Sequence, residues 1–138
     1  MSLLNPEQFW RHVPPRWKPR YHFFNKGITA SPTDADSVQT LTKQLGLTQN
    51  DFVAFKLDID TPTIEIPIAL DLLNGNSHFA ELVDEFFFEL HFRCEIMMPC
   101  GWDSGMPDKV EGLRLDRPGA LELFRDLRRR GIRAHFWP

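Results

Sequence analysis

The sequence predicts an α/β fold, a small three-layer domain built on a largely parallel sheet. Two apolar runs with the composition of strands occur near residues 52–58 and 83–92, and a shorter run closes the chain at 132–137. Between these runs, apolar residues recur at helical spacing. Strands that alternate with helices favour a parallel sheet, because a parallel crossover needs a connection long enough to hold a helix.

Two helices are expected around the first strand. Residues 34–47 show an apolar helical spacing and carry Gly46 where a helix usually stops. After the strand, a second apolar face runs over residues 64–73. Pro67 falls inside this pattern and is best tolerated in a first turn, so we expect the second helix to begin later than its pattern suggests.

The second half of the chain contains a short turn, a long loop and a last helix. Ser77 is expected to cap the turn that precedes the second strand. Residues 93–115 have no clear period and are predicted to be a long loop, a kind of segment that often forms lids or binding loops. Asp116 is expected to cap the last helix, which should end at Gly131.

Composition indicates one domain with a substantial core. The chain has 138 residues, of which 42% are hydrophobic, including 12 Phe and 4 Trp. A net charge of −3 argues against electrostatic binding of nucleic acid or acidic lipid. The two Cys suit a reducing compartment, and neither a secretory signal nor a run of about 20 apolar residues is seen. The expected location is therefore cytoplasmic.

Residues 1–33 form a proline- and aromatic-rich arm, distinct from the α/β domain of residues 34–138. Its five Pro interrupt any long element, while Trp and Phe supply apolar surface and alternate with Arg and Lys. A nucleic-acid arm is one interpretation. The overall acidity of the chain favours another, a basic and aromatic strap that packs over the domain or over a partner.

Four polar residues mark a candidate catalytic or metal site. Asp58 and Asp60 follow the first strand, and Glu89 and His91 lie toward the end of the second. Because ligands of parallel sheets bind outside the carboxyl ends of the strands, these groups should meet at one edge. Carboxylate and imidazole together suit Mg, Mn or non-haem Fe. Lys56 shares a face with the two Asp and offers an alternative, a structural ion pair.

Other ligand sets are weaker. His91, Cys94 and Cys100 lack the paired short spacings of a structural zinc site. His135 could join the acidic cluster if its strand is parallel to the others, and an edge or core histidine is the alternative. Glycine-rich phosphate loops and the Gly-x-Ser-x-Gly nucleophile motif do not occur in the sequence.

The segment Lys56-Leu-Asp-Ile-Asp60, followed by Glu65 and an apolar helix, resembles the Lys-x-Asp-x-Glu-Gly-x-Glu segment of FkbM-type S-adenosylmethionine-dependent methyltransferases. The run from Val83 to His91 looks like the following strand of that family, which often ends in Glu-x-His, and residues 132–136 are similar to its next strand. The resemblance covers roughly residues 50–137. It implies the C-terminal half of a Rossmann-like fold, without the glycine-rich loop that holds the cofactor.

Three functions follow from these observations. The first is a truncated or degenerate methyltransferase-like domain whose acidic edge binds a small molecule or a metal, with S-adenosylmethionine or a divalent metal as cofactor. The second is a metal-dependent hydrolase or transferase that uses Asp58, Asp60, Glu89 and His91. The third is a non-catalytic binding module that forms a homodimer or recruits a protein partner. Neither nucleic acid nor membrane is an expected partner.

Overall fold

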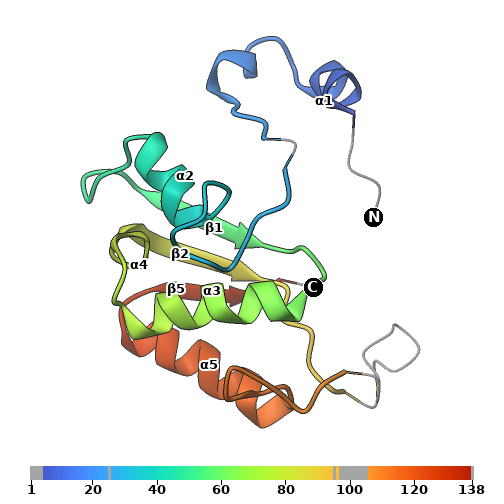
Figure 1. The fold of residues 1–138 in the computed structure, drawn as a ribbon, viewed down its shortest axis with the longest axis vertical. Coiled ribbons are helices and arrows are strands. Elements are labelled where there is room, and N and C mark those ends of the chain that lie inside the picture. Colours follow the sequence, from blue (N-terminus) through green and yellow to red (C-terminus); the bar gives the residue numbers. More distant parts are fainter. Residues whose placement is uncertain (1–4, 25, 95, 97–105, 138) are drawn as a thin grey trace.

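The computed structural model describes residues 5–24, 26–94, 96 and 106–137. It shows a mixed α/β domain whose main sheet has three parallel strands and is flanked by helices (Figure 1). The strands, in their spatial order, are β1 (Val53–Leu57), β2 (Val83–Phe88) and β5 (Arg133–Phe136). The predicted α/β class with a largely parallel sheet is confirmed.

The helices described between and before these strands are α1 (Pro6–His12), the 3₁₀ turn η1 (Lys18–Arg20), α2 (Val38–Gln44), α3 (Pro62–Asn74), α4 (His78–Leu82) and α5 (Arg117–Arg129). The segment predicted to be one long loop contains a short antiparallel hairpin, β3 (Lys109–Val110) and β4 (Leu113–Arg114). Residues 95 and 97–105 of that segment, including Cys100, lie outside the described residues.

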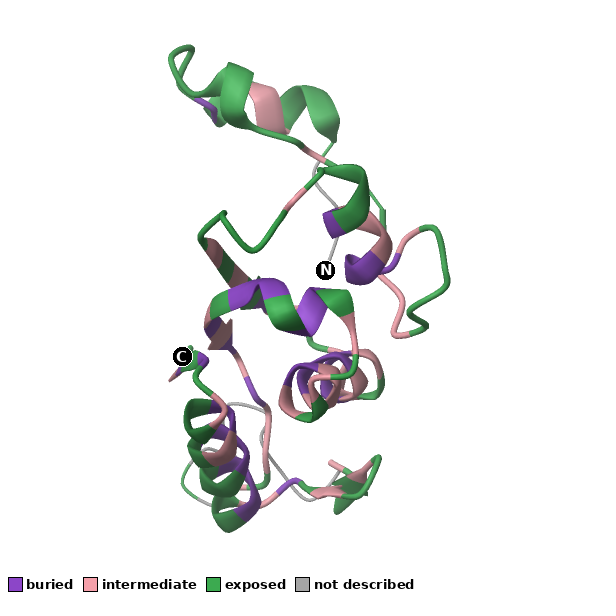
Figure 2. Cartoon of the chain, turned by 90° about the vertical axis from the view of Figure 1, so that its left-hand side faces the viewer, coloured by how far each residue is buried: buried purple, intermediate pink, exposed green. Residues whose placement is uncertain are grey.

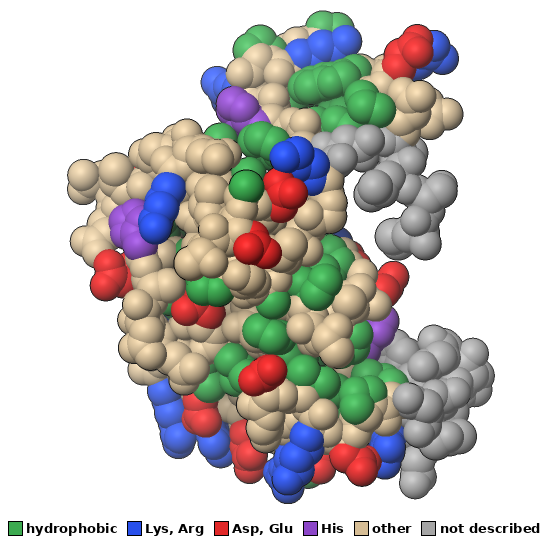
Figure 3. Space-filling view, viewed as in Figure 1, with side chains coloured by type: hydrophobic (Ala, Val, Ile, Leu, Met, Phe, Trp, Pro, Cys, Tyr) green, Lys and Arg blue, Asp and Glu red, His purple; other side chains and the backbone are tan. Residues whose placement is uncertain are grey.

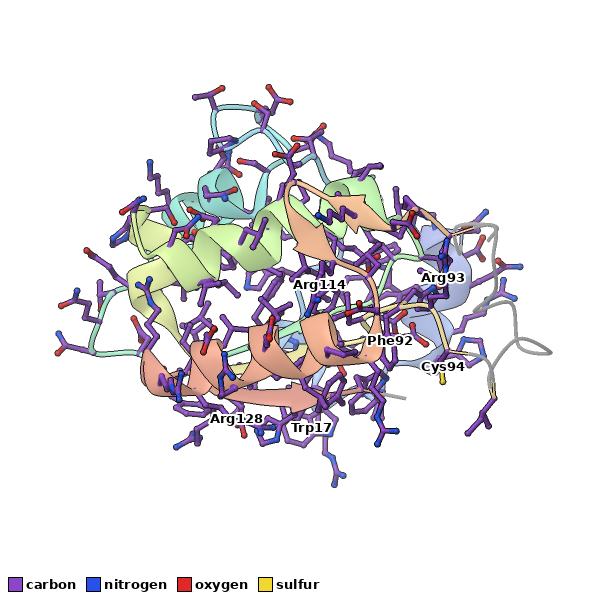
Figure 4. The ribbon with its side chains drawn as sticks, turned by 90° about the horizontal axis from the view of Figure 1, so that it is seen from below. Trp17, Phe92, Arg93, Cys94, Arg114 and Arg128 are labelled. Atoms are coloured by element: carbon purple, nitrogen blue, oxygen red, sulfur yellow. The ribbon has the colours of Figure 1, made fainter. Side chains whose placement is uncertain are left out.

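One face of the sheet packs against α3 and α5 and forms the core. Phe86 and Phe88 of β2 are completely buried there, and Phe86 stacks on Phe55 of β1. Phe124 of α5 stacks on Phe88, with ring centroids 6.3 Å apart. Arg128 fastens α5 to the edge strand, because its Nε donates to the carbonyl oxygen of Ala134 at 2.9 Å (Figure 4). Aromatic stacking that runs from β1 through β2 to α5 therefore holds α5 on this face.

Side chains on the other face of the sheet stay partly exposed. The residues of this open face are Phe52, Ala54, Lys56, Glu85, Phe87, Arg133, His135 and Trp137. They contact one another: Phe87 stacks on His135 at 4.8 Å and meets Trp137 edge-on at 6.0 Å. Figure 2 shows the buried residues concentrated on the helical side of the domain.

Three element boundaries differ clearly from the prediction. Helix α2 covers only Val38–Gln44, whereas the helical pattern was expected over residues 34–47. Helix α3 begins at Pro62, earlier than expected, and Pro67 lies inside it rather than in its first turn. Pro62 fits this position, because a proline at the start of a helix has no needed N–H to lose and already has helical φ. Strand β2 ends at Phe88, so Glu89 to Phe92 follow the strand instead of extending it.

The predicted helix caps are confirmed. Ser77 Oγ accepts from the backbone N–H of Ala80 at 3.0 Å, and Asp116 Oδ1 accepts from that of Gly119 at 2.7 Å. Each bond satisfies an amide that the first helical turn leaves without an intrahelical partner. Both helices consequently start where a short polar side chain precedes the apolar pattern.

The arm stands apart from the domain for most of its length (Figures 1 and 2). Neither α1 nor η1 contains a buried residue, and the arm is held mainly by its own aromatic rings, such as Phe9 stacked on Phe23 at 4.1 Å. Figure 3 shows hydrophobic and basic side chains together on its surface. The last residues of the arm do join the domain, since Ile28 packs against the core and Thr29 forms a β-bridge with Ser37.

Membrane insertion through a helix finds no support in the structure. Among the described residues, none of the helices combines the length and the apolar character that crossing a bilayer requires.

Candidate functional site

The candidate site lies at the carboxyl ends of β1 and β2. Asp58 directly follows β1, and Glu89 directly follows β2. The two strands stay together here, because the N–H of Glu89 donates to the carbonyl oxygen of Leu57 at 3.1 Å. This bond continues the parallel ladder by one residue and brings the two carboxyl groups side by side. The predicted meeting of strand ends at one edge of the sheet is thus observed.

A tight turn after β1 positions Asp60. Its backbone has φ of 53°, in the left-handed region that residues other than Gly seldom adopt. The buried carboxylate of Glu65 in α3 holds both neighbours of Asp60, accepting from the N–H of Ile59 and from that of Thr61, each at 3.0 Å. The turn therefore keeps an unfavourable backbone conformation that the Glu65 side chain fixes from both sides.

Asp60, Glu89 and His91 form a cluster with the geometry of a metal site. The Nε2 atom of His91 lies 3.5 Å from Oδ1 of Asp60 and 3.8 Å from Oε1 of Glu89, and the three donor atoms are all within 4.8 Å of one another. An ion about 2.1 Å from each ligand atom holds such atoms roughly 3–4 Å apart. Two carboxylates and an imidazole that fit this spacing can bind Mn²⁺, Fe²⁺ or Zn²⁺.

Asp58 joins the cluster through Glu89. The two carboxyl groups share a hydrogen bond, which lowers the pKa of Asp58 and raises the pKa of Glu89. Lys56 lowers the pKa of Asp58 further through its ion pair with that carboxylate. When the pair holds one proton, Glu89 is therefore the group that carries it and donates the hydrogen bond to Asp58. The expected structural ion pair and the expected acidic cluster are both present, and they have Asp58 in common.

Glu65 is the buried carboxyl group of the site. Its exposed fraction is 2%, and burial raises its pKa, although the two backbone N–H donors partly oppose the shift. Removal from water disfavours a carboxylate, so the backbone donors compensate only in part. The structural consequence is a rigid link between α3 and the turn that carries Asp60.

A cavity of about 490 Å³ reaches Asp58, the neighbour of the cluster, although Asp60, Glu89 and His91 do not line it. Asp58, Ile59, Thr61 and Ile64 form one side of it, and Lys26, Gly27 and Ile28 form the other. The second group comes from the segment that joins the arm to the domain. Its walls are mainly apolar, while Asp58 places a carboxylate at the side shared with the cluster. A small organic molecule in this cavity would have its polar end near the acidic edge.

The remaining predicted ligands lie elsewhere. His135 is on the open face, with Nε2 2.9 Å from Oε1 of Glu85, so it does not join the cluster. Its strand is parallel to β2 as supposed, but its register partner is Phe87, and its side chain lies on the open face beside Glu85. Cys94 is a free thiol in the described chain. Cys100 lies outside the described residues, so the zinc set that includes it is not tested.

Two contributors to the site were not assigned a role from the sequence. Glu65 entered only as a counterpart of a family residue, and its hold on the turn depends on how α3 packs. A weak signal exists, since a carboxylate in the first turn of a helix often accepts backbone N–H bonds near the helix start. The sequence contains no signal for the cavity wall formed by residues 26–28, because only the tertiary fold brings these residues to the sheet edge.

Fold and site together define an α/β domain with an acidic, metal-type cluster at the carboxyl edge of a parallel sheet. Comparisons with protein families, with curated proteins and with solved structures give no match for this chain. The resemblance to FkbM-type methyltransferases consequently stays a proposal, and the function must be argued from the site.

Proposed function

We propose that this domain binds a divalent cation through Asp60, Glu89 and His91 and acts on a small molecule held in the adjoining cavity, as a metal-dependent hydrolase or transferase. The observation that carries the proposal is the convergence of three ligand atoms within 4.8 Å of one another. Asp58, which is hydrogen-bonded to Glu89, connects this cluster to the cavity of about 490 Å³. A cation in such a site polarises a bound oxygen or acidifies a bound water.

The side chains around the cluster have separate parts in this proposal. Glu65 holds the turn, so that Asp60 reaches His91 without a rearrangement of the backbone. Asp58 raises the pKa of Glu89, and a proton held by Glu89 must leave when a cation binds. With the proton gone, Asp58 is the group placed to accept a proton from a ligand in the cavity, because it lines the cavity and is also a member of the carboxyl pair.

Calorimetric titration of chelator-treated protein with Mn²⁺, Mg²⁺ and Zn²⁺ tests the proposal. We expect saturable binding of one ion, and loss of affinity by at least about tenfold in Asp60→Ala and His91→Ala. His135→Ala is a matched control, since His135 also lies beside a glutamate but on the open face. Equal affinity in all three variants, or the absence of saturable binding, would show that the cluster is not a metal site.

S-adenosylmethionine binding is the second candidate. It is supported by the ordered resemblance and by the parallel order β1-β2-β5, with a cavity at the carboxyl end of β1. Acids at this position of a Rossmann-like sheet accept hydrogen bonds from ribose hydroxyls, and Asp58 is the residue placed to do so. Titration with S-adenosylmethionine tests this. No heat at high protein concentration would leave at most a relationship of fold.

A further inference from the structure

The open face of the sheet, the eight residues defined above from β1, β2 and β5 and their flanks, carries a continuous aromatic and charged network. Phe52 is 63% exposed and Trp137 is 40% exposed. Parallel sheets are found almost always with both faces covered, because each strand has apolar side chains on both sides. Here α3 and α5 cover only the face that holds Phe86 and Phe88. Within the part of the chain that the structure describes, the open face is thus an unpartnered surface.

Charge on the open face narrows the choice of partner. Lys56 pairs with Asp58, while Arg133 Nε lies 3.8 Å and His135 Nε2 lies 2.9 Å from Oε1 of Glu85. Each basic side chain of the face already lies beside a carboxylate of the same chain. Phosphate groups would have to displace these carboxylates, which disfavours a nucleic acid. A surface whose charges compensate one another meets an identical surface without net repulsion.

The aromatic rings of the face support the same partner. Lys56 Nζ lies 4.4 Å from the ring centroid of Trp137, and Arg133 Cζ lies 5.2 Å from that of Phe52. These contacts hold two large exposed rings at opposite ends of the face, with Phe87 between them. Large, pre-positioned aromatic groups with little rotamer entropy to lose are the usual anchors of protein interfaces.

We propose that the open face is the interface between two copies of this chain, packed sheet to sheet about a twofold axis. An isologous contact of this kind uses the same patch on both subunits and closes after two copies, so it produces a dimer and not a fibre. The interface supplies the cover that the second face of a parallel sheet requires. This proposal is independent of the metal site, which lies at the sheet edge.

Sedimentation velocity on the full chain, from micromolar to millimolar concentration, tests the interface. We expect a monomer–dimer equilibrium in the unaltered protein. Phe52→Ser and Trp137→Ser should each weaken dimerisation by about tenfold or more, as hot-spot residues do. Leu121→Ser is the matched control, because Leu121 is 53% exposed but lies on α5. This variant should dimerise as the unaltered protein does. Circular dichroism establishes that the variants are folded.

Several results would overturn the proposal. A monomer at millimolar concentration excludes the interface. Dimerisation that Phe52→Ser and Trp137→Ser leave unchanged, or that Leu121→Ser weakens equally, places the contact elsewhere. Titration with a single-stranded oligonucleotide is the last experiment. Oligonucleotide binding that is lost in Trp137→Ser, while the protein stays monomeric, would assign the face to nucleic acid.

Discussion

The substitution Glu65→Ala tests whether one buried carboxyl group holds the turn of the candidate site. The side chain is 2% exposed and accepts two backbone hydrogen bonds, from Ile59 and Thr61. Hydrogen bonds to a carboxyl acceptor of this kind contribute about 1–3 kcal/mol each, and truncation also leaves both N–H groups without their partner. Relief of the desolvated carboxylate offsets part of the loss. We expect a net decrease of about 2–4 kcal/mol in the free energy of unfolding.

The effect of Glu65→Ala should depend on pH in a defined direction. Burial raises the pKa of Glu65 in the folded protein. A group whose folded pKa is raised contributes its full stability below the unfolded pKa, about 4.3 for Glu, and loses part of it as pH rises through the folded value. The difference in stability between the unaltered protein and the variant should therefore be largest in acid and shrink toward neutral pH.

Urea denaturation over a series of pH values measures both effects. Glu122→Ala is the control, because Glu122 is an exposed residue of α5 and should change stability by less than about 0.5 kcal/mol. Calorimetry with Mn²⁺ on Glu65→Ala should show weaker binding than in the unaltered protein, since Asp60 loses its fixed turn. A difference below about 0.5 kcal/mol for Glu65→Ala, or one that grows as pH rises, would refute the anchoring role.

Three further predictions concern the site and the arm. Asp58→Asn and Asp60→Asn should each change the free energy of unfolding by less than about 1 kcal/mol in urea titration, because both groups remain partly solvated; a loss of several kcal/mol would indicate a buried structural pair. Since Asp58 raises the pKa of Glu89, Mn²⁺ affinity should fall as pH is lowered through that raised value, and calorimetry on Asp58→Asn should show the fall displaced to lower pH. Deleting residues 1–30 removes Ile28 from the core and should cause aggregation in light scattering, whereas a soluble deletion form of unchanged thermal stability would contradict this.

The order of elements was predictable because periodicity survives without knowledge of tertiary contacts. Each run of strand composition became a strand, and the caps at Ser77 and Asp116 followed from local hydrogen bonding. Boundaries were harder where one residue type serves two purposes. A proline is common both after a strand and at the start of a helix, so the residue type at position 62 could not show that α3 begins at Pro62.

The candidate site was predictable only to the extent that parallel topology determines it. Once two strands run parallel as neighbours, the residues after each strand must meet, so Asp60, Glu89 and His91 could be grouped from the sequence. His135 shows the limit of this argument. A residue on a parallel strand does not have to lie at the edge of the sheet, because the register determines its position along the neighbouring strand. The register here pairs His135 with Phe87, inside the sheet.

Lys56 connects the two surfaces of the molecule. Its ammonium group pairs with Asp58 at the edge and lies over the ring of Trp137 on the open face. The same ion pair helps to lower the pKa of Asp58, and Asp58 in turn raises the pKa of Glu89. Burying Trp137 against a second copy would remove water from around this ammonium and strengthen its attraction for Asp58. The proposed interface would thus lie one side chain, that of Lys56, away from the acidic edge.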